Sequence, residues 1–430
     1  MDRNLVKVFL KYVSLSVAGM IGISFYILAD TFFIAKGSGS DGLAALNFTF
    51  PPWYIMNGTS LMIAIGASSR FSISKNKKLF SHGFYTAMFF GCLISVTAIA
   101  FAPSAVAFMG ADGGIKEMAS VYIRILLGAS PLFFLSNLLI FFARNDANPS
   151  IAMKAMLAGS FANIILDYVF ILLFDMGMTG AALATIISPI TSILVLLKYI
   201  LKRRDLFSPF ADRISLRISM DILSMGIYAF LSDIAAGISV FYFNILILEN
   251  SGAIGVAAYG IIANTALVVN AVFAGIGQGM QPLIADFKGK GDIFSARKIL
   301  CLSIVLSAGF FLIVYLLVFF MASQIVSSFN SLNNTALKEI AENGIRIYFL
   351  SFAFSGINIV FSVCLGAYDQ PKEAFAVSIL RGIAVMLPCL FLLNCLLGLN
   401  GIWMSPAVAE FVVMFVSLFF VRKYFYLQKA

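Results

Sequence analysis

The sequence predicts an all-α polytopic membrane protein, with twelve transmembrane helices in two six-helix bundles related by a pseudo-two-fold axis along the membrane normal. Three observations lead to this fold class: an apolar composition, repeated apolar stretches and an internal repeat. Of the 430 residues, 61% are hydrophobic and 11% are charged, and the mean hydropathy is +0.98. Soluble domains are about 45–50% apolar and about 25% charged, so this composition excludes that class.

Twelve apolar stretches are each long enough to cross a bilayer as a helix, which requires about 20 residues. They lie near 11–35, 45–69, 84–109, 117–142, 150–174, 179–200, 222–248, 254–282, 297–321, 337–366, 373–396 and 401–424. The first stretch is longer than a signal-peptide core and leads into further spans, so we interpret it as the first span. Four prolines inside spans, Pro131, Pro189, Pro388 and Pro406, predict either kinks or static shaping of their helices.

Basic residues gather on one side of the predicted spans. They precede the first span, follow the second and the eighth, and fill the central linker with Lys202, Arg203, Arg204, Arg213 and Arg217. Cytoplasmic loops carry the excess of Lys and Arg in membrane proteins, so both termini and the linker are predicted to be cytoplasmic. These loops account for the net charge of +9, and we expect no nucleic-acid partner.

The second half of the chain repeats the first. The matching segments are GSDGLAAL (39–46) with GAIGVAAY (252–259), YIRI (122–125) with GIRI (344–347), Pro149 with Pro371, and GMTG (177–180) with GLNG (398–401). Four matches in the same order predict an N-terminal six-helix lobe at 1–200, a cytoplasmic basic linker at 201–221 and a C-terminal six-helix lobe at 222–430. Six spans per lobe make both lobes enter the membrane in the same direction, which is a plan seen in transporters.

Two acids lie deep inside the N-terminal spans. A charge at mid-bilayer costs roughly 2.5–3.5 kcal/mol, so such acids face a partner or a water-filled cavity. A rise of about 1.5 Å per residue places Asp30, Asp167 and Thr185 in the outer half of this lobe. Asn163 precedes Asp167 by one turn and shares its helix face. The four side chains predict an oxygen-rich site for a hard cation or a proton, and the alternative is a set of separate polar contacts between helices.

A third acid, Asp233, lies near mid-depth in the seventh span and has no counterpart in the repeat. It is predicted either to face a central cleft and attract a cationic substrate or to pack between helices. Gln278 and Gln281, in the glycine-rich segment GIGQGMQP of the eighth span, are further candidates for the cleft.

Two further charges, Arg381 and Glu410, fall at similar depth in the last two spans. We predict a structural ion pair between them inside the C-terminal bundle. Arg124 and Arg346 are equivalent in the repeat, and both are expected to extend toward the membrane interface.

Motifs of soluble enzymes are absent from the sequence, including a P-loop, GxSxG, HExxH and a metal-spaced Cys/His set. We therefore expect no enzyme activity and no cofactor. The five cysteines are interpreted as apolar packing residues. The only histidine, His82, is expected at the surface of a basic loop.

Several segments together resemble a known transporter family. They are ILADTFFIAKGSGSDGLAAL (27–46), NIILDYVFI (163–171), GAALAT (180–185), AAYGII (257–262) and QGMQPLI (278–284). The chain resembles the multidrug and toxic compound extrusion (MATE) family along essentially its whole length, most closely the bacterial branch typified by MepA-like exporters. The resemblance departs at span one, which has no proline, and in the middle of span ten, which has no acid.

The resemblance implies a function for the acidic site. The family's cation site falls on Asp30, Asn163, Asp167 and Thr185, with H⁺ or Na⁺ as the coupling ion. The expected activity is export of lipophilic, cationic small molecules by a monomer in the bacterial plasma (inner) membrane. The alternatives are a lipid-linked saccharide flippase of the same superfamily, an intramembrane enzyme and a receptor that does not transport.

Overall fold

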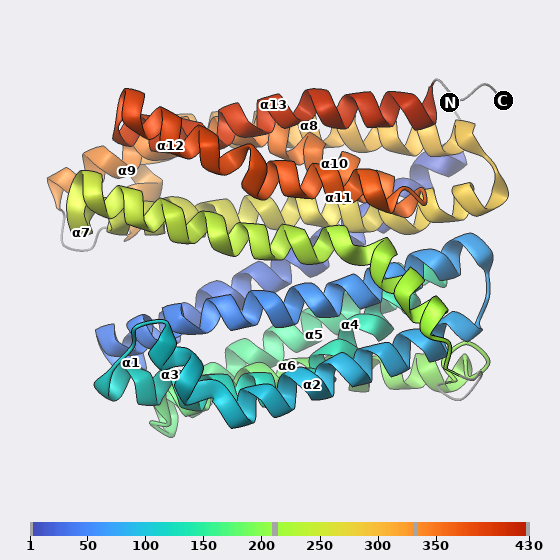
Figure 1. Cartoon of the computed structure of the whole chain (residues 1–430), viewed down its shortest axis with the longest axis horizontal. Helices are drawn as coiled ribbons and strands as arrows, with labels where there is room; N and C mark the ends of the chain where they lie inside the picture. The colour runs from blue at the N-terminus through green and yellow to red at the C-terminus, as the bar shows by residue number, and fades with distance from the viewer. Residues whose placement is uncertain (1–2, 209–213, 330–333, 427–430) are drawn as a thin grey trace. The chain divides into compact units, whose positions relative to one another are not determined.

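The computed structural model describes residues 3–208, 214–329 and 334–426, and these residues are almost entirely helical (Figure 1). The predicted all-α fold class is therefore confirmed. The linker residue Arg213 lies outside the described residues. The elements are α1 (Arg3–Ser74), α2 (Lys78–Phe108), α3 (Gly113–Gly128), α4 (Ser130–Asn145), α5 (Pro149–Asp167), η1 (Tyr168–Leu173), α6 (Gly177–Lys202), α7 (Leu216–Lys290), α8 (Ile293–Phe329), α9 (Thr335–Tyr348), η2 (Phe349–Ser351), α10 (Phe352–Ala367), α11 (Pro371–Ile379), η3 (Leu380–Ala384), α12 (Met386–Leu397) and α13 (Leu399–Phe425).

The helices account for twelve predicted spans. Among the described residues, nine helices are long and apolar enough to cross a membrane, and α3 with α4, bent by 47°, form a tenth crossing. The bend falls just before Pro131, as expected for a proline. Helices as long as α1 and α7 would extend about 110 Å, far beyond a bilayer of about 30 Å. Each instead contains a non-helical glycine that divides it into two spans, so that the count agrees with twelve.

The backbone repeats at the positions that the sequence pairs. Gly39 in α1 has φ 63° and ψ −153°, and Gly252 in α7 has φ 63° and ψ −160°. Gly177 and Gly398, at the starts of α6 and α13, also share a positive φ, of 50° and 56°. The predicted repeat is thus visible in the path of the chain as well as in its letters.

The structure divides into two compact units, residues 1–234 and 235–430. The first unit contains α1 to α6 and the beginning of α7, whereas the sequence predicts the lobe boundary in the linker at 201–221. The reason is a close approach inside the first unit: a Cβ on Gly66 of α1 would overlap the carbonyl oxygen of Ile222 on α7. The division into two functional lobes at 1–200 and 222–430 stays a prediction.

Three connections meet at one end of the first unit. The Lys77 ammonium, after α1, lies 2.5 Å from the Asp205 carboxylate, after α6, and this hydrogen bond lowers the pKa of Asp205. Arg203 lies 2.6 Å from Asp146, between α4 and α5. These contacts agree with a topology in which the basic connections lie on one side of the membrane.

In the second unit, α10 packs against α8, α11 and α13. An aromatic column joins α7 to α13 in the same unit, since the ring of Tyr259 on α7 is stacked 6.0 Å from Trp403 of α13 and 5.4 Å from Phe243 of α7. Trp403 and Phe243 are fully or almost fully buried.

The expectation for His82 is wrong. Helix α2 begins at Lys78, earlier than predicted, and His82 is only 1% exposed. The neighbouring Gly83 explains this burial, because a Cβ there would lie 3.0 Å from Ala67 of α1 and 3.2 Å from Leu138 of α4. The first turns of α2 therefore pack inside the unit instead of forming a loop.

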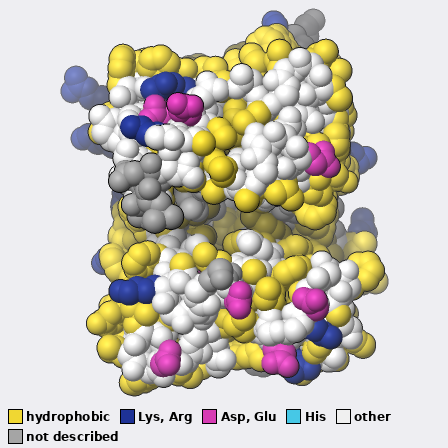
Figure 2. All heavy atoms as spheres, turned by 90° about the vertical axis from the view of Figure 1, so that its left-hand side faces the viewer, with side chains coloured by type: hydrophobic (Ala, Val, Ile, Leu, Met, Phe, Trp, Pro, Cys, Tyr) yellow, Lys and Arg dark blue, Asp and Glu magenta, His cyan; other side chains and the backbone are white. Residues whose placement is uncertain are grey.

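The charged side chains form no single patch on the face drawn in Figure 2. Acidic and basic groups are scattered there among hydrophobic and other side chains.

Candidate cation site

The structure places the four predicted cation-site residues on the buried faces of three helices in the first unit. Asp30 on α1 is 9% exposed, Asn163 and Asp167 on α5 are fully buried, and Thr185 on α6 is 5% exposed. The Asn163 amide donates a hydrogen bond to the Thr185 hydroxyl at 3.4 Å. The Asp30 and Asp167 carboxylates are close enough to repel each other. The predicted oxygen-rich cluster is therefore present as a spatial group.

Four oxygen atoms of this cluster are buried without a hydrogen-bond partner among the described residues. They are Asp30 Oδ1, Asn163 Oδ1, and both carboxylate oxygens of Asp167. Buried polar atoms are nearly always hydrogen-bonded, and each exception calls for an explanation such as an ion. Buried carboxylates need a cation, a proton or a charged partner, since burying an uncompensated charge is costly. The cluster therefore has the chemistry of a site that receives positive charge.

Two tyrosines that the sequence did not reveal complete the cluster. Tyr26 lies one turn before Asp30 on α1 and interacts electrostatically with Asp30 and Asp167. Tyr122 on α3 interacts with the same two acids and shares a hydrogen bond with Thr185. The spacing of four residues between Tyr26 and Asp30 could have revealed the first. No local signal points to Tyr122, because only folding brings α3 to α6.

Small residues allow the helices of the site to approach closely. A Cβ on Gly22 of α1 would lie 2.6 Å from Leu157 of α5, and a Cβ on Gly159 of α5 would lie 2.5 Å from the Ser192 hydroxyl of α6. Small residues at such contacts are typical of helix packing in membranes. They bring Asp30 and Thr185 to the helix that carries Asp167.

The helix changes its geometry immediately after Asp167. Residues Tyr168–Leu173 form the π-helix η1, in which the Phe174 amide donates to the Val169 carbonyl at 2.9 Å. Segments of π-helix are rare and are frequent at functional sites. Asp167 thus ends a regular helix at the point where the backbone can adjust.

The donor set suits a proton or a hard cation. Carboxylate, amide and hydroxyl oxygens are the ligands that hard cations prefer. Among the described residues no group of three His, Cys, Asp or Glu side chains could hold a metal ion. This donor set fits Na⁺ or H⁺ better than a transition metal.

Asp233 lies on α7 in the first unit, apart from this cluster. Its carboxylate accepts a hydrogen bond of 2.7 Å from the Asn57 amide on α1. A Cβ on Gly58 would lie 3.2 Å from the Asp233 Cβ, so the two helices are in close contact here. This geometry supports the packing alternative and does not test a role toward substrate.

The other cleft candidates, Gln278 and Gln281, both lie on the second part of α7. Gln281 is 1% exposed and Gln278 is partly buried, and each has an interaction partner. Their role in a cleft stays a prediction.

The ion pair predicted between Arg381 and Glu410 is present. The Arg381 guanidinium donates to both Glu410 carboxylate oxygens at 2.7 and 2.9 Å. Asn358 donates to the same carboxylate at 2.7 Å, and Arg381 also donates to the Ser355 hydroxyl at 3.2 Å. Arg381 itself lies in the π-helix η3. The pair is thus held by contacts among α10, η3 and α13, and its structural role stays a prediction.

A comparison with known families finds a match along most of the chain. The sequence profile of the MatE family matches residues 16–169 and 229–392. The matched segments include Asp30, Asn163, Asp167 and Asp233, whereas Thr185 and Glu410 lie outside them.

Named relatives and solved structures agree with this match. The chain is 29% identical to the multidrug export protein MepA of Staphylococcus aureus, over 90% of this chain and 86% of that protein. It is 28% identical to MepA of Staphylococcus saprophyticus, over 95% and 91% of the two chains. Its fold is similar to an outward-facing multidrug resistance MATE family transporter of the MOP superfamily, with a TM-score of 0.89, 21% identity, and 97% and 95% coverage. A mutant of the Vibrio cholerae MATE transporter VcmN also gives 0.89, at 20% identity and 98% coverage of both chains.

Proposed function

The chain belongs to the MatE family, and from this premise we propose that it is a secondary active antiporter that exports lipophilic, cationic small molecules in exchange for H⁺ or Na⁺. The relatives that bear the name multidrug export protein support the export of small molecules. The buried oxygens without partners at Asp30, Asn163 and Asp167 are the single observation that carries the coupling step.

The coupling ion settles between the acids of the first unit. A state in which two neighbouring carboxylates are both charged and bind no ion is unfavourable, because the two negative charges repel each other. An incoming H⁺ or Na⁺ relieves this repulsion and satisfies oxygens that have no other partner. An ion that binds one conformation better than another shifts the equilibrium by its differential affinity. We propose that occupancy of the Asp30 and Asp167 carboxylates favours the conformation that releases the exported molecule to the outside.

The energy comes from the ion gradient. One charge that moves across 100 mV gains about 2.3 kcal/mol. When a monovalent cationic drug leaves as one ion enters, no net charge crosses the membrane. The chemical gradient of the ion then supplies the work, so transport is expected to depend on ΔpH or on the sodium gradient and little on voltage.

The substrate is held by apolar surface with few charges. The chain contains 44 Phe and 18 Met residues, whose side chains are large, and methionine in particular adapts to different ligands. We propose that Asp233 adds the polar recognition of a cation, and Gln278 and Gln281 are separate candidates for contact with the substrate. Asp233→Asn is expected to weaken transport of cationic compounds while neutral lipophilic compounds of similar size are unaffected.

Reconstituted vesicles test the coupling step. Purified protein is placed in proteoliposomes, and drug-dependent ion movement is recorded with a pH-sensitive dye and, at fixed pH, with a sodium-sensitive dye. Asp30→Asn and Asp167→Asn are expected to abolish the movement of whichever ion is coupled. Asp205→Asn, at an exposed position of the linker, is the matched control and is expected to keep it.

The result that contradicts the proposal is equally specific. Unchanged drug-dependent ion movement in both Asp30→Asn and Asp167→Asn would show that these carboxylates do not bind the coupling ion. Each variant is first compared with the wild type for its unfolding temperature in detergent, so that loss of fold is separated from loss of coupling.

The orientation and assembly follow from the charge pattern. We propose that the chain works as a monomer in the bacterial plasma membrane with both termini in the cytoplasm. The basic connections gathered at one end of the first unit support this orientation. Cysteines introduced next to Lys77 are expected to react with a membrane-impermeant reagent only from the cytoplasmic side.

A further inference from the structure

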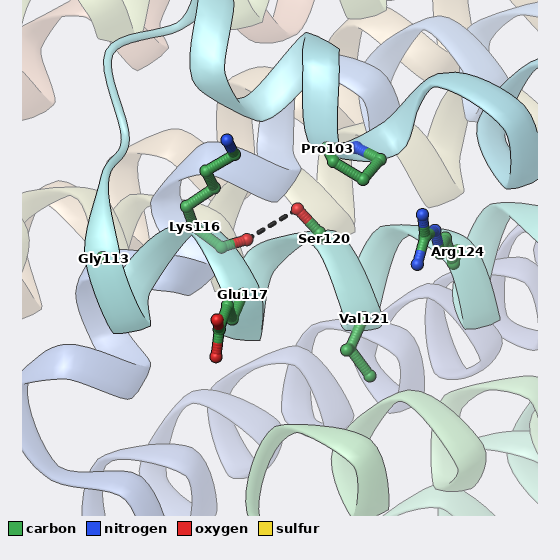
Figure 3. Close-up of a pocket in the computed structure, with 7 residues that line it drawn as sticks. All are labelled: Pro103, Gly113, Lys116, Glu117, Ser120, Val121 and Arg124. Carbon is green, nitrogen blue, oxygen red and sulfur yellow. Dashed lines mark hydrogen bonds between the residues drawn. The ribbon is translucent and has the colours of Figure 1, made fainter.

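A pocket of about 500 Å³ lies beside α3 in the first unit, and none of its lining residues belongs to the cation site described above (Figure 3). One face of α3 supplies Lys116, Ser120 and Arg124, and Pro103 of α2 covers them from the opposite side. Figure 3 shows the Lys116 and Arg124 side chains on the side of α3 that faces Pro103, whereas the Glu117 carboxylate points the other way. The pocket, which Glu117 also lines, thus presents two cationic groups with a hydroxyl between them.

The internal repeat gives this pocket a built-in comparison. At the shift of 222 residues that pairs YIRI with GIRI, the chain has Lys116 with Lys338, Glu117 with Glu339, and Arg124 with Arg346. The residue between the two cations differs: it is Ser120 in the first unit and Glu342 in the second.

In the second unit, the carboxylate between the cations partners both of them. Glu342 lies 3.8 Å from the Lys338 ammonium and 3.9 Å from the Arg346 guanidinium. Arg346 also donates to the Phe319 carbonyl and lies over the Phe319 ring at 5.7 Å. This half of the repeat supplies its own anion.

In the first unit, the same two cations have no such anion. Neither the Lys116 ammonium nor the Arg124 guanidinium forms an ion pair or a side-chain hydrogen bond with any residue that the structure describes. The Ser120 hydroxyl donates at 2.6 Å to the Lys116 carbonyl of its own helix. The position between the two cations, which the Glu342 carboxylate occupies in the second unit, thus has no carboxylate in the first unit and faces the pocket.

The depth of the pocket indicates which anion is available. Helix α2 has 31 residues and so extends about 46 Å, close to the 40–45 Å of a bilayer with its headgroups. Pro103 lies five residues before the end of α2 at Phe108, so it is about 7 Å from that end, where hydrocarbon gives way to headgroups. Phospholipid phosphates are concentrated at this level.

We propose that the pocket formed by Lys116, Ser120, Arg124 and Pro103 binds the phosphate of an anionic phospholipid, which takes the place that Glu342 occupies in the other half of the chain. Under the predicted orientation, this lipid belongs to the outer leaflet. The phosphate oxygens accept from the Lys116 ammonium and from the Arg124 guanidinium, whose planar fork suits phosphate. The acyl chains then lie along the apolar side of α2 and α3.

Protection of lysine from chemical labelling tests this site. The full chain in neutral detergent is titrated with phosphatidylglycerol, then with phosphatidylcholine, then with inorganic phosphate, and acetylation of Lys116 and Lys338 is measured by peptide mass spectrometry. Phosphatidylglycerol is expected to protect Lys116 at lower concentration than phosphatidylcholine, and inorganic phosphate is expected to give little protection. Protection of Lys338, which is already paired with Glu342, is expected to be unaffected by lipid.

Variants exchange the two halves of the repeat. Ser120→Glu supplies the missing carboxylate and is expected to make the labelling of Lys116 independent of lipid. Glu342→Ser removes it from the other half and is expected to create lipid-dependent protection of Lys338. Arg124→Gln, at an exposed position, is expected to raise the phosphatidylglycerol concentration for half-protection about fivefold. This factor corresponds to the binding free energy that one Lys or Arg contributes near an anionic lipid surface. Arg346→Gln is the matched control and leaves the protection of Lys116 as in the wild type.

Two results would overturn the proposal. One is a titration in which phosphatidylglycerol protects Lys116 in the Arg124→Gln variant at the same concentration as in the wild type. The other is protection by inorganic phosphate equal to that by phosphatidylglycerol, which would assign the pocket to a free anion. Ser120 is buried, so a glutamate there can destabilise the protein. If Ser120→Glu lowers the unfolding temperature, the titration of Arg124→Gln is the test of the lipid site.

Discussion

Gly226 of α7 and Met62 of α1 are in direct backbone contact, because a Cβ at position 226 would overlap the Met62 carbonyl oxygen. The reciprocal contact is made by Gly66, whose Cβ would lie 3.2 Å from the Gly226 amide nitrogen. Two glycines thus let two helix backbones touch inside the first unit. This crossing explains why the beginning of α7 belongs to that unit and not to the one that follows.

Gly226→Ala is expected to destabilise the protein by about 1–3 kcal/mol, since overpacking at a rigid backbone contact cannot be relieved by a rotamer change. Its unfolding temperature in detergent is the measurement. Gly260→Ala, in the same helix with no atom near its Cβ, is the matched control. Equal unfolding temperatures for the two variants would show that the helices separate easily at this crossing.

Gly39→Ala is expected to destabilise by about 1–3 kcal/mol through the backbone alone, because its φ of 63° with ψ of −153° belongs to a region used almost only by glycine. Space is not the cause, since nothing lies within 4 Å of a Cβ there. Gly252→Ala is expected to behave in the same way, as its repeat partner. Gly309→Ala in α8, also with open space around it but helical, is expected to stabilise slightly. A Gly39→Ala variant as stable as Gly309→Ala would contradict this account.

Thr185→Val is expected to weaken the coupling-ion affinity by about tenfold to a hundredfold, because it removes a hydroxyl next to charged groups, where a hydrogen bond contributes about 1.5–3 kcal/mol. Thr185→Ser keeps the hydroxyl and is expected to behave like the wild type. The measurement is the ion concentration for half-maximal drug transport in proteoliposomes. Thr191→Val, which loses only a bond to its own helix, is the control on α6. Parallel losses in Thr185→Val and Thr191→Val would assign the effect to the helix.

Glu410→Gln is expected to lower the free energy of unfolding by about 1.5–3 kcal/mol, because it takes the charged hydrogen-bond acceptor from the partly buried Arg381. The double variant Arg381→Met with Glu410→Leu removes both charges and is expected to recover much of that loss. Thermal unfolding of the purified proteins gives the comparison. The single variants Arg381→Met and Glu410→Leu complete the cycle. A double variant whose loss equals the sum of their two losses would show that the pair contributes no coupling energy.

The sequence predicted the parts of the fold that depend on neighbouring residues. Apolar stretches marked the spans, and the repeated letters at 39–46 and 252–259 marked the two glycine breaks, although the sequence did not show that these are kinks. The pairing of Arg381 with Glu410 followed from counting residues along two helices. The expectation for His82 failed because a basic neighbourhood in the sequence does not show which side of the helix faces the core.

The candidate site was predictable in part. Asp30, Asn163, Asp167 and Thr185 were found by type and depth, since an acid inside an apolar stretch is conspicuous. Tyr122 was missed because an aromatic residue in a membrane helix is ordinary until a distant acid lies beside it. The difference between Ser120 and Glu342 likewise gained meaning only when one pair of cations was found with an anion and the other without.

The sequence by itself determined where helices form, where they break and which polar groups they carry into the membrane. Only the tertiary structure decided which faces meet, which oxygens are left without partners and where α7 joins the first unit. The physical reason is that hydropathy and glycine conformation act along the chain. The contacts that bury Asp167 and leave Arg124 exposed are made between residues far apart in sequence, and they exist only once the helices have packed.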